Sequence, residues 1–236
     1  MSKKAWIIFA AICVALLAGL VYFSSKDRVN LDGVDVNAVQ KPNEQSGNIA
    51  DHVFGKADSK VMFVEYGDFQ CPGCGSAYAP VKEVTEKYKD QLAFVFRNFP
   101  LSSLHPNARA AAAAAESAGL QGKYWEMHDK LYENQNTWGS VSASERTDFF
   151  ATYAQELGIK VDQFKTDLAS TGVNKKINYD QAIGKKVGVN ATPTFFLNGK
   201  KMDNIYGANG SVDQEKLDKV IADALKAAGI ELPKDK

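Results

Sequence analysis

Two cysteines three positions apart, Cys71 and Cys74, are the side chains of this sequence whose type and spacing can do chemistry. Such a pair can close a small disulfide, and a cysteine at the start of a helix meets backbone N–H groups and the positive helix end, which stabilise its thiolate. A thiolate is the species that attacks, or leaves, in thiol–disulfide exchange. The second cysteine then lies deeper and resolves the mixed disulfide. A C-x-x-C motif at the end of a strand in a βαβ unit is typical of a redox pair.

Two other uses of these cysteines fit the sequence less well. A zinc site needs four ligands, whereas His52, His105 and His128 stand singly and the third cysteine, Cys13, lies in an apolar run. A structural disulfide stabilises more when it closes a longer loop, and this loop is short. We therefore expect a redox role and no metal site.

An acidic side chain, Glu65, precedes the first cysteine by six residues within the apolar run Val61 to Tyr66. Both faces of that strand are otherwise apolar, so we expect the carboxyl group to be buried and its pKa to be raised by desolvation. A buried carboxyl group can exchange a proton with the resolving thiol. The alternative is a glutamate at the strand end that reaches solvent.

The dipeptide Thr192-Pro193 stands at the start of a later strand, Thr194 to Leu197. A cis bond there would leave backbone groups free to pair with an extended substrate segment. Statistics alone favour the trans form, because only about one X–Pro bond in twenty is cis.

The elements that must position these residues follow a β-α-β order, then helices, then β-β-α. Val61 to Tyr66 and Leu92 to Phe96 read as buried strands on either side of a helix from Cys71 to Tyr88, with Pro72 in its first turn. After the strand Thr194 to Leu197, the turn Asn198-Gly199 predicts a hairpin. Its expected partner strand is Lys201 to Tyr206, and Ser211 is the expected cap of a final amphipathic helix.

The region from about residue 102 to residue 187 gives helical signals throughout. The expected helices are Ala108 to Ala118, Gln121 to Asn134, a helix after the capping box Ser142 to Glu145, Val161 to Leu168, and about Asn174 to Val187. This helical region interrupts the strand pattern.

Composition excludes several classes of protein. The chain has 236 residues with 28 basic and 28 acidic side chains, and a zero net charge argues against a nucleic-acid binder. Its 45% hydrophobic and 24% charged residues are values of a globular protein. Three cysteines are too few for a disulfide-rich scaffold.

An almost unbroken apolar run from Ala5 to Phe23 predicts a transmembrane helix, because nineteen helical residues rise about 28 Å, close to the hydrocarbon thickness of a bilayer. Lys3 and Lys4 precede the run, which places the N-terminus in the cytoplasm. A cleaved signal peptide is the alternative, but it needs a shorter apolar core and an A-x-A-like site, and the run is followed by Ser24-Ser25-Lys26. The polar residues 24–50 read as a flexible tether.

Three stretches of the chain together resemble the DsbA-like thiol–disulfide oxidoreductases, which are thioredoxin-fold proteins with a helical domain inserted in the sheet. These stretches are Glu65 with Phe69 to Cys74, Gln121 to His128, and Val189 to Phe196, and the resemblance covers about residues 50–228. It implies an α/β, thioredoxin-like fold with an inserted helical domain, here preceded by an N-terminal transmembrane helix. The expected divisions are a cytoplasmic N-terminus at 1–4, an anchor at 5–23, a tether at 24–50, a thioredoxin-like domain at 51–101 and 188–230, and an inserted helical domain at 102–187.

The resemblance also implies roles for individual residues. Cys71 would be the surface nucleophile, Cys74 the buried resolving cysteine and Glu65 the family's buried acid. Thr192-Pro193 would be the cis-proline element that faces the disulfide and cradles the substrate backbone. The Cys71–Cys74 disulfide would itself be the redox centre, without a separate cofactor. The partners would be unfolded or reduced secreted proteins and a quinone-linked membrane reoxidase of the DsbB or vitamin-K-epoxide-reductase type.

The dipeptide between the cysteines departs from the best-known oxidising members of that family. Those members carry Pro-His, whereas this chain has Pro72-Gly73, and glycine supplies neither a donor nor a charge near the thiolate. We therefore expect a less depressed pKa for Cys71 and a less oxidising disulfide than in those members. Oxidase, isomerase and reductase directions stay open.

Taken together, these features predict a monomeric, single-pass, membrane-anchored oxidoreductase whose catalytic body lies outside a bacterial cytoplasmic membrane. One alternative is a peptide-binding, chaperone-like module that has kept the fold but lost exchange. Another is a glutathione-linked transferase or isomerase of a related fold, which would not require both Cys71 and Cys74.

Overall fold

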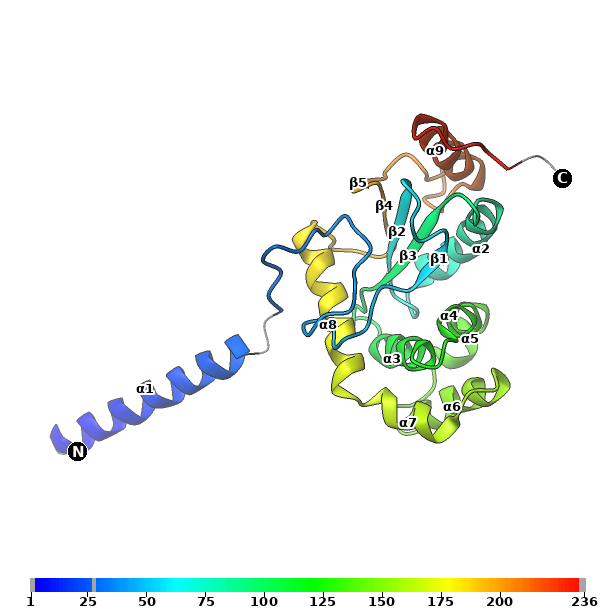
Figure 1. Cartoon of the computed structure of the whole chain (residues 1–236). Coiled ribbons are helices and arrows are strands. Elements are labelled where there is room, and N and C mark those ends of the chain that lie inside the picture. Colours follow the sequence, from blue (N-terminus) through cyan, green and yellow to red (C-terminus); the bar gives the residue numbers. More distant parts are fainter. Residues whose placement is uncertain (1–2, 27–28, 234–236) are drawn as a thin grey trace. The chain divides into compact units, whose positions relative to one another are not determined.

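Five short strands form the sheet on which the cysteine pair is mounted (Figure 1). The structure is a computed structural model that describes residues 3–26 and 29–233, and within 3–26 it describes the side chains of residues 4 and 6–19. In spatial order the strands are β1 (Val53–Gly55), β3 (Ala93–Asn98), β2 (Met62–Gly67), β4 (Thr194–Leu197) and β5 (Lys200–Lys201).

The predicted βαβ unit forms the centre of this sheet. Strands β2 and β3 pair in parallel and are joined by helix α2 (Pro72–Lys87), while β4 pairs antiparallel with the other side of β2. Every residue of β2 and β3 is buried. Burial of both faces is why these two strands read as continuous apolar runs rather than as an alternating pattern.

The edges of the sheet differ from the prediction. Asn198 (φ 49°) and Gly199 (φ 76°) make the predicted hairpin turn, since both positions of such a turn need positive φ. The partner strand β5 ends at Lys201 instead of Tyr206, because the chain turns away and Tyr206 forms only an isolated bridge with Val212. Strand β1, antiparallel to β3, is not predicted from the sequence, because its three residues are too few to show a period.

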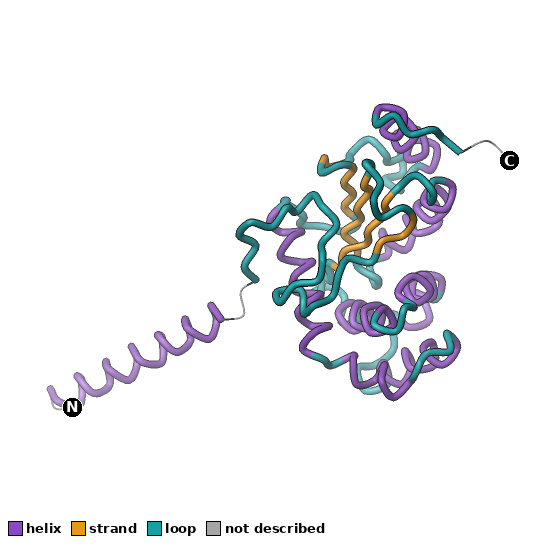
Figure 2. Tube along the Cα trace, viewed as in Figure 1, coloured by secondary structure: helices purple, strands orange, loops and turns teal. Residues whose placement is uncertain are grey.

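Helices cover both faces of the sheet (Figure 2). On one face, Phe63 and Phe94 belong to a buried cluster with residues of α2 and of the last helix, α9 (Gln214–Ala227). On the opposite face, α8 (Thr171–Lys186) lies along β3, and Gly184 leaves room there for the rings of Tyr66 and Phe99. Glu65 shares its face of β2 with Phe63, so its side chain points toward α2.

The region between β3 and β4 is helical, as predicted. Its helices are α3 (Ala108–Gly119), α4 (Tyr124–Glu133), α5 (Gln135–Trp138), α6 (Arg146–Glu156), α7 (Val161–Leu168) and α8. Two predicted caps are wrong. Helix α6 begins after Glu145, and the Ser142 hydroxyl donates to the Glu145 carboxylate at 2.5 Å instead of capping the backbone. Helix α9 is capped by Asp213 instead of Ser211, because Asp213 Oδ1 accepts from the Lys216 N–H at 3.1 Å.

The predicted tether is wrong for residues 33–50, which pack on the body of the protein. Gln40 and Ile49 of this segment are buried, and the chain from Gly33 onward belongs to one compact unit. Arg97 on β3 explains the packing, because its two terminal nitrogens donate to the carbonyl oxygens of Val36 and Ala38, each at 2.8 Å. A buried guanidinium group needs such acceptors, and the segment supplies them.

Helix α1 (Lys3–Lys26) is continuous. In the residues that the structure describes, no helix has both the length and the apolarity needed to cross a membrane. The predicted anchor at 5–23 lies within α1, although the structure does not describe the side chains of residues 5 and 20–23, and the predicted cytoplasmic end at 1–4 lies partly outside the described residues.

Candidate functional site

The cysteine pair lies at the start of α2, just after the loop that follows β2. Cys71 is the N-cap residue of α2, with extended backbone angles (φ −70°, ψ 124°), and Pro72 follows inside the first turn. Proline is well tolerated there because the first backbone N–H groups of a helix have no helical partner. Cys71 keeps 9% of its surface exposed, whereas Cys74, one turn further, is fully buried. Both are free thiols, and their order of exposure is the predicted one.

The pKa of the Cys71 thiol is lowered to about 5 from its usual 9.0. The largest contribution is a hydrogen bond from the Cys74 thiol, and the Thr192 hydroxyl and the backbone N–H groups of Cys74 and Gly73 add to it against the opposing effect of burial. Donors at a helix N-terminus favour the charged form of a sulfur that they face. Cys71 is therefore mostly thiolate at neutral pH, although Gly73 contributes no side-chain donor.

The pKa values of the two cysteine thiols are shifted in opposite directions. The pKa of Cys74 is raised well above 9.0, first by burial, then by its hydrogen bond to Cys71 and by the nearby Glu65 charge. The Asp68 backbone N–H donates weakly to the Cys74 sulfur at 3.5 Å and only partly offsets these effects. In the reduced pair, the thiolate charge is therefore better held on Cys71 than on Cys74.

The Thr192–Pro193 peptide bond is cis, as the family resemblance implies and against the bare statistics. It lies against the cysteine loop: the Cys71 thiol donates to the Thr192 carbonyl oxygen at 3.4 Å. A Cβ added at Gly73 would lie 3.3 Å from the Pro193 ring. The Thr192 hydroxyl is buried and has no hydrogen-bond partner in the described part of the chain other than the Cys71 sulfur that it stabilises.

Glu65 is buried, as predicted, with 3% of its surface exposed. Its carboxyl pKa is raised from 4.5 to about 8 by burial and, to a smaller extent, by the charge of Cys71. Its neighbours across the sheet are Phe96 on β3 and Phe195 on β4. Gly67 lies under the Phe96 ring, where any side chain would collide with it. These apolar neighbours leave Glu65 protonated at neutral pH.

Sequence reasoning missed the side chains that hold the cysteine loop from the helical region. Gln135 Nε2 donates to the carbonyl oxygens of Phe69 at 2.7 Å and of Cys71 at 2.9 Å. Gln70 donates to the Gly139 carbonyl oxygen at 2.7 Å and accepts from the Asn107 N–H at 2.6 Å. No sequence signal marks Gln135, because its partners are 64 and 66 positions away along the chain.

Asp68 is a second residue that the sequence does not single out. Its buried carboxylate accepts from the backbone N–H groups of Gln70 and Leu101 and contacts His105 Nδ1, each at 2.8 Å. Its own carbonyl oxygen accepts from the Cys71 N–H at 3.0 Å. Asp68 therefore ties the start of the cysteine loop to the chain that follows β3.

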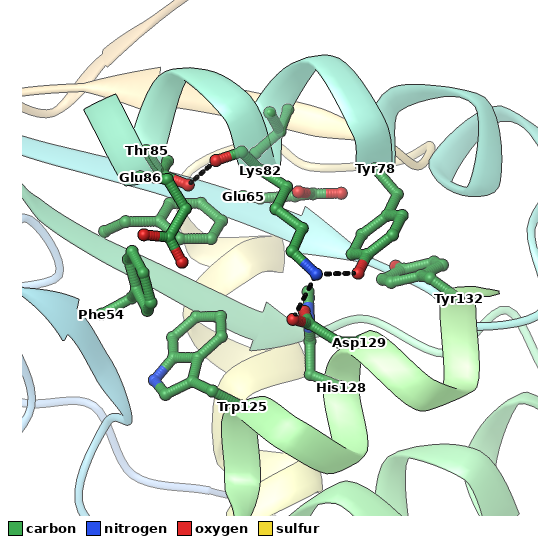
Figure 3. Close-up of a pocket in the computed structure, with 12 residues that line it drawn as sticks. Phe54, Glu65, Tyr78, Lys82, Thr85, Glu86, Trp125, His128, Asp129 and Tyr132 are labelled. Atoms are coloured by element: carbon green, nitrogen blue, oxygen red, sulfur yellow. Dashed lines mark hydrogen bonds and ion pairs between the residues drawn. The ribbon is translucent and has the colours of Figure 1, made fainter. Parts of the chain in front are cut away.

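A small cavity opens beside Glu65, between α2 and α4 (Figure 3). It has room for about 30 Å³ of solvent, which is one or two water molecules. Lys82 of α2 reaches across it to Asp129 of α4, with 2.7 Å between the Lys82 nitrogen and Asp129 Oδ2. His128 also lines this cavity. Among the described residues, no cluster of histidine, cysteine and acidic side chains is arranged to hold a metal ion.

Comparison with known proteins agrees with this architecture. The family model described as thioredoxin matches residues 47–223. A thioredoxin-like oxidoreductase from Silicibacter pomeroyi has a TM-score of 0.60 and 26% identity, over 78% of this chain and 98% of its own. The α-DsbA1 protein of Wolbachia pipientis has a TM-score of 0.62 and 23% identity, over 75% of this chain and 92% of its own, which shows the shared fold.

A curated sequence relative is a much longer protein. The Na⁺/H⁺ antiporter NhaA 1 of Mycolicibacterium vanbaalenii is 40% identical over 151 residues, which are 63% of this chain and 23% of the antiporter. This chain thus spans about a quarter of the length of the curated relative.

Proposed function

We propose that this chain, which belongs to the thioredoxin family and has the fold of its DsbA-like thiol–disulfide oxidoreductases, exchanges disulfides with other proteins through Cys71 and Cys74. The observation that carries the proposal is the inequality of the two sulfurs: the pKa of Cys71 is lowered to about 5, whereas that of the buried Cys74 is raised. A structural disulfide does not require its two cysteines to differ in pKa. An exchange reaction does, because the thiolate of lower pKa is the better leaving group.

The exchange begins on the oxidised pair. A client thiolate attacks Cys71 Sγ, so that a bond forms between the client sulfur and Cys71 while the Cys71–Cys74 bond breaks and its electron pair leaves on Cys74. Glu65, protonated at neutral pH, gives its proton to that buried thiolate. A second client thiolate then attacks the client sulfur of the mixed disulfide and releases Cys71 as a thiolate. The client is oxidised by two electrons, and the pair is reduced by two.

Thr192 and Pro193 are proposed to hold the client backbone during these steps. The cis peptide bond lies directly over Cys71, and the Thr192 carbonyl oxygen is already 3.4 Å from its sulfur. An extended client segment placed along Thr192 can pair with the backbone in the manner of an added strand. The Cys71–Cys74 disulfide serves as the redox centre in this scheme, without a separate cofactor.

The proposal includes the cellular location of the reaction and its partner proteins. The run from Ala5 to Phe23 supports anchoring in a membrane with the body on the extracytoplasmic side, where disulfides persist. The clients would be reduced secreted or cell-envelope proteins, and a quinone-linked membrane partner of DsbB or vitamin-K-epoxide-reductase type would reoxidise the pair. Gly73 stands where strongly oxidising relatives have a histidine, so the motif alone does not give the direction of exchange. A measured reduction potential of the Cys71–Cys74 pair distinguishes the two directions: about −120 mV indicates an oxidase and about −270 mV a reductase.

A trapping experiment tests the proposal. In the Cys74→Ala variant the resolving sulfur is absent. When the Cys71 thiolate attacks a client disulfide, a bond forms between Cys71 and one client sulfur while the other client sulfur leaves as a thiolate, and this mixed disulfide should accumulate until dithiothreitol is added. The Cys71→Ala variant is the matched control and should trap nothing. If Cys74→Ala captures no disulfide-bonded protein or disulfide reagent, exchange through Cys71 is wrong. Client binding that persists unchanged in a double Cys71→Ser, Cys74→Ser variant would instead indicate a chaperone-like module.

A further inference from the structure

The carboxyl group of Glu65 has to exchange its proton with solvent once in every catalytic cycle, if the proposed function above holds. After it gives its proton to Cys74, the Glu65 carboxylate takes up another proton from solvent at neutral pH, because its pKa is about 8. It must lose that proton again before it can accept the Cys74 proton on reoxidation. Yet Glu65 lies in the central strand of the sheet with 3% of its surface exposed. Among the described residues, no side chain forms a hydrogen bond or ion pair with its carboxyl group. A route for the proton must therefore run through water.

The cavity beside Glu65 has room for that water. Its room of about 30 Å³ holds one or two water molecules. The titratable groups that line it come from three elements: Glu65 from β2, Tyr78, Lys82 and Glu86 from α2, and His128, Asp129 and Tyr132 from α4. Figure 3 shows Glu65 behind the Lys82 side chain and His128 below it.

Three buried polar atoms on α4 side chains that line this cavity lack partners in the described part of the chain. They are Trp125 Nε1, His128 Nε2 and the Tyr132 hydroxyl. Buried polar atoms without a protein partner are the usual binding sites of internal water. A water molecule in the cavity would have the Glu65 carboxyl group, His128 Nε2 and the Tyr132 hydroxyl as its partners.

The other ring nitrogen of His128 leads to the surface. His128 Nδ1 lies 3.1 Å from Asp129 Oδ1, and the Asp129 side chain is 32% exposed, compared with 6% for His128. The acceptor on Nδ1 favours the tautomer in which Nδ1 carries the hydrogen, which leaves Nε2 as an acceptor toward the cavity. A proton can thus enter at one nitrogen and leave at the other.

The remaining groups at the cavity are less suited to carry a proton. Lys82 already uses its ammonium group on Asp129 at 2.7 Å and on the Tyr78 hydroxyl at 2.8 Å. These contacts raise its pKa although burial opposes them. Burial raises the pKa of Tyr132 well above 10.0, so its hydroxyl can orient water but does not ionise near neutral pH. Burial lowers the pKa of His128, against the effect of Asp129, so its ring is neutral at neutral pH and its Nε2 can accept a hydrogen bond from water.

We propose that His128 and Asp129 form a proton relay that connects Glu65, through one or two water molecules in this cavity, with solvent at the surface of α4. When Glu65 loses its proton to solvent, the proton passes to water and then to His128 Nε2, while the Nδ1 proton passes to Asp129 and out. When the Glu65 carboxylate needs a proton, the same transfers run in reverse. No group is oxidised or reduced in this relay, and His128 acts on the cysteine pair only through Glu65.

The test measures steady-state turnover of the Cys71–Cys74 pair in the full-length protein, with a dithiol peptide as the client and glutathione disulfide as the oxidant, from pH 5 to pH 9, in H₂O and D₂O. His128→Gln keeps a hydrogen-bonding side chain but cannot relay a proton. We expect it to lower the rate at least about tenfold, part of the 10²–10⁴-fold that acid–base catalysis supplies, and to change the solvent isotope effect. The matched control is His52→Gln, which removes an imidazole that pairs with Glu116 instead and should leave the rate and its pH profile unchanged.

Combination with Glu65→Gln separates a relay from a structural role. In the Glu65→Gln background, His128→Gln should cause no further loss, since there is no proton left to carry. A further tenfold loss in that background would overturn the relay, as would a His128→Gln rate and pH profile within twofold of the wild type. A wild-type chain that exchanges no disulfide at all would overturn the proposed function itself, and that result is visible before any variant is made.

A readout without turnover covers the case in which His128→Gln folds poorly. The protonated Glu65 carboxyl group has an infrared C=O band, and its hydrogen–deuterium exchange can be followed in the resting protein. We expect Asp129→Asn, which changes a partly exposed residue, to slow this exchange several-fold. Exchange as fast as in the wild type would show that Glu65 reaches solvent by another path and would overturn the proposal.

Discussion

The side-chain amide of Gln135 donates a hydrogen bond to the carbonyl oxygen of Cys71 at 2.9 Å. Gln135 belongs to the short helix α5 of the helical region, whereas Cys71 begins α2 of the thioredoxin-like part. The same amide nitrogen donates a second hydrogen bond to the Phe69 carbonyl oxygen at 2.7 Å, two residues before Cys71. The inserted helices thus hold the backbone of the redox loop directly, in addition to covering it.

Replacement of Gln135 by alanine should loosen this loop. The Phe69 carbonyl oxygen would lose this donor, whereas the Cys71 carbonyl oxygen would keep the Gly75 N–H at 3.0 Å. A buried acceptor that is left unpaired costs about 1–3 kcal/mol of unfolding free energy. We expect urea unfolding to show this loss and the alkylation rate of Cys71 to change. Gln121→Ala is the control, because Gln121 bonds Lys160 at an exposed site. Equal losses in the two variants would contradict a specific role for Gln135.

The thiolate of Cys71 should depend on its partner cysteine. The hydrogen bond from Cys74 is the largest of the effects that lower the pKa of Cys71 to about 5. In Cys74→Ala we therefore expect this pKa to rise toward its ordinary value of 9.0. Thiolate absorbance near 240 nm, followed as a function of pH, measures the shift. An unchanged titration would show that the helix N-terminus and Thr192 alone account for the low pKa.

Glu65 should reduce the stability of the protein at neutral pH. Its pKa is raised from 4.5 in the unfolded chain to about 8 in the fold, so the native state binds more protons between these values and stability falls as pH rises through them. The penalty is absent below pH 4.5 and reaches about 3 kcal/mol at pH 7, at about 1.4 kcal/mol for each pKa unit.

The Glu65→Gln variant tests this penalty. We expect it to be more stable than the wild type at pH 7 by roughly 2–3 kcal/mol and equally stable at pH 4, while its turnover is slower. Guanidinium unfolding at the two pH values measures the first effect, and client oxidation the second. A variant that is less stable at pH 7 would mean that Glu65 is ionised and paired in the fold.

The packing of residues 33–50 on the body of the protein should depend on a cluster of buried charged side chains. Asp51 accepts from Arg97 at 2.8 Å and from Lys176 at 2.9 Å, and Lys176 also pairs with Asp180 at 2.6 Å, all of them buried. Lys176→Met leaves the buried Asp180 carboxylate without a cation and Asp51 with Arg97 alone, and should cost about 3–5 kcal/mol. It should also expose the segment, whose carbonyl groups bind Arg97, to proteases.

A surface ion pair provides the comparison. Lys219 pairs with Asp223 at 2.5 Å on the exposed side of α9, and Lys219→Met should cost no more than about 0.5 kcal/mol. Thermal unfolding of the two variants, with limited proteolysis of the segment, measures the difference. Similar melting temperatures would show that the buried charges do not hold the segment in place.

The sequence alone determined the features that depend on local pattern. The βαβ order, the C-x-x-C pair at the start of α2 and the burial of Glu65 follow from an apolar strand, a proline-led helix and a six-residue spacing. Helix α7 was predicted to the residue, although no side chain caps its first turn. The cis form of Thr192–Pro193 came from family resemblance, since local statistics favour trans.

Only the tertiary structure decided which distant groups meet. Gln135, His128 and Lys82 stand on helices whose sequence shows an ordinary amphipathic pattern, and their place beside the cysteine pair or Glu65 depends on how α4 and α5 pack against α2. The tether was mistaken for the same reason, because polar residues 33–50 are held by a buried arginine on β3 that is more than forty positions away. Local sequence specifies elements and spacing, whereas the pKa of a thiol or a carboxyl depends on partners that packing brings within a few ångströms.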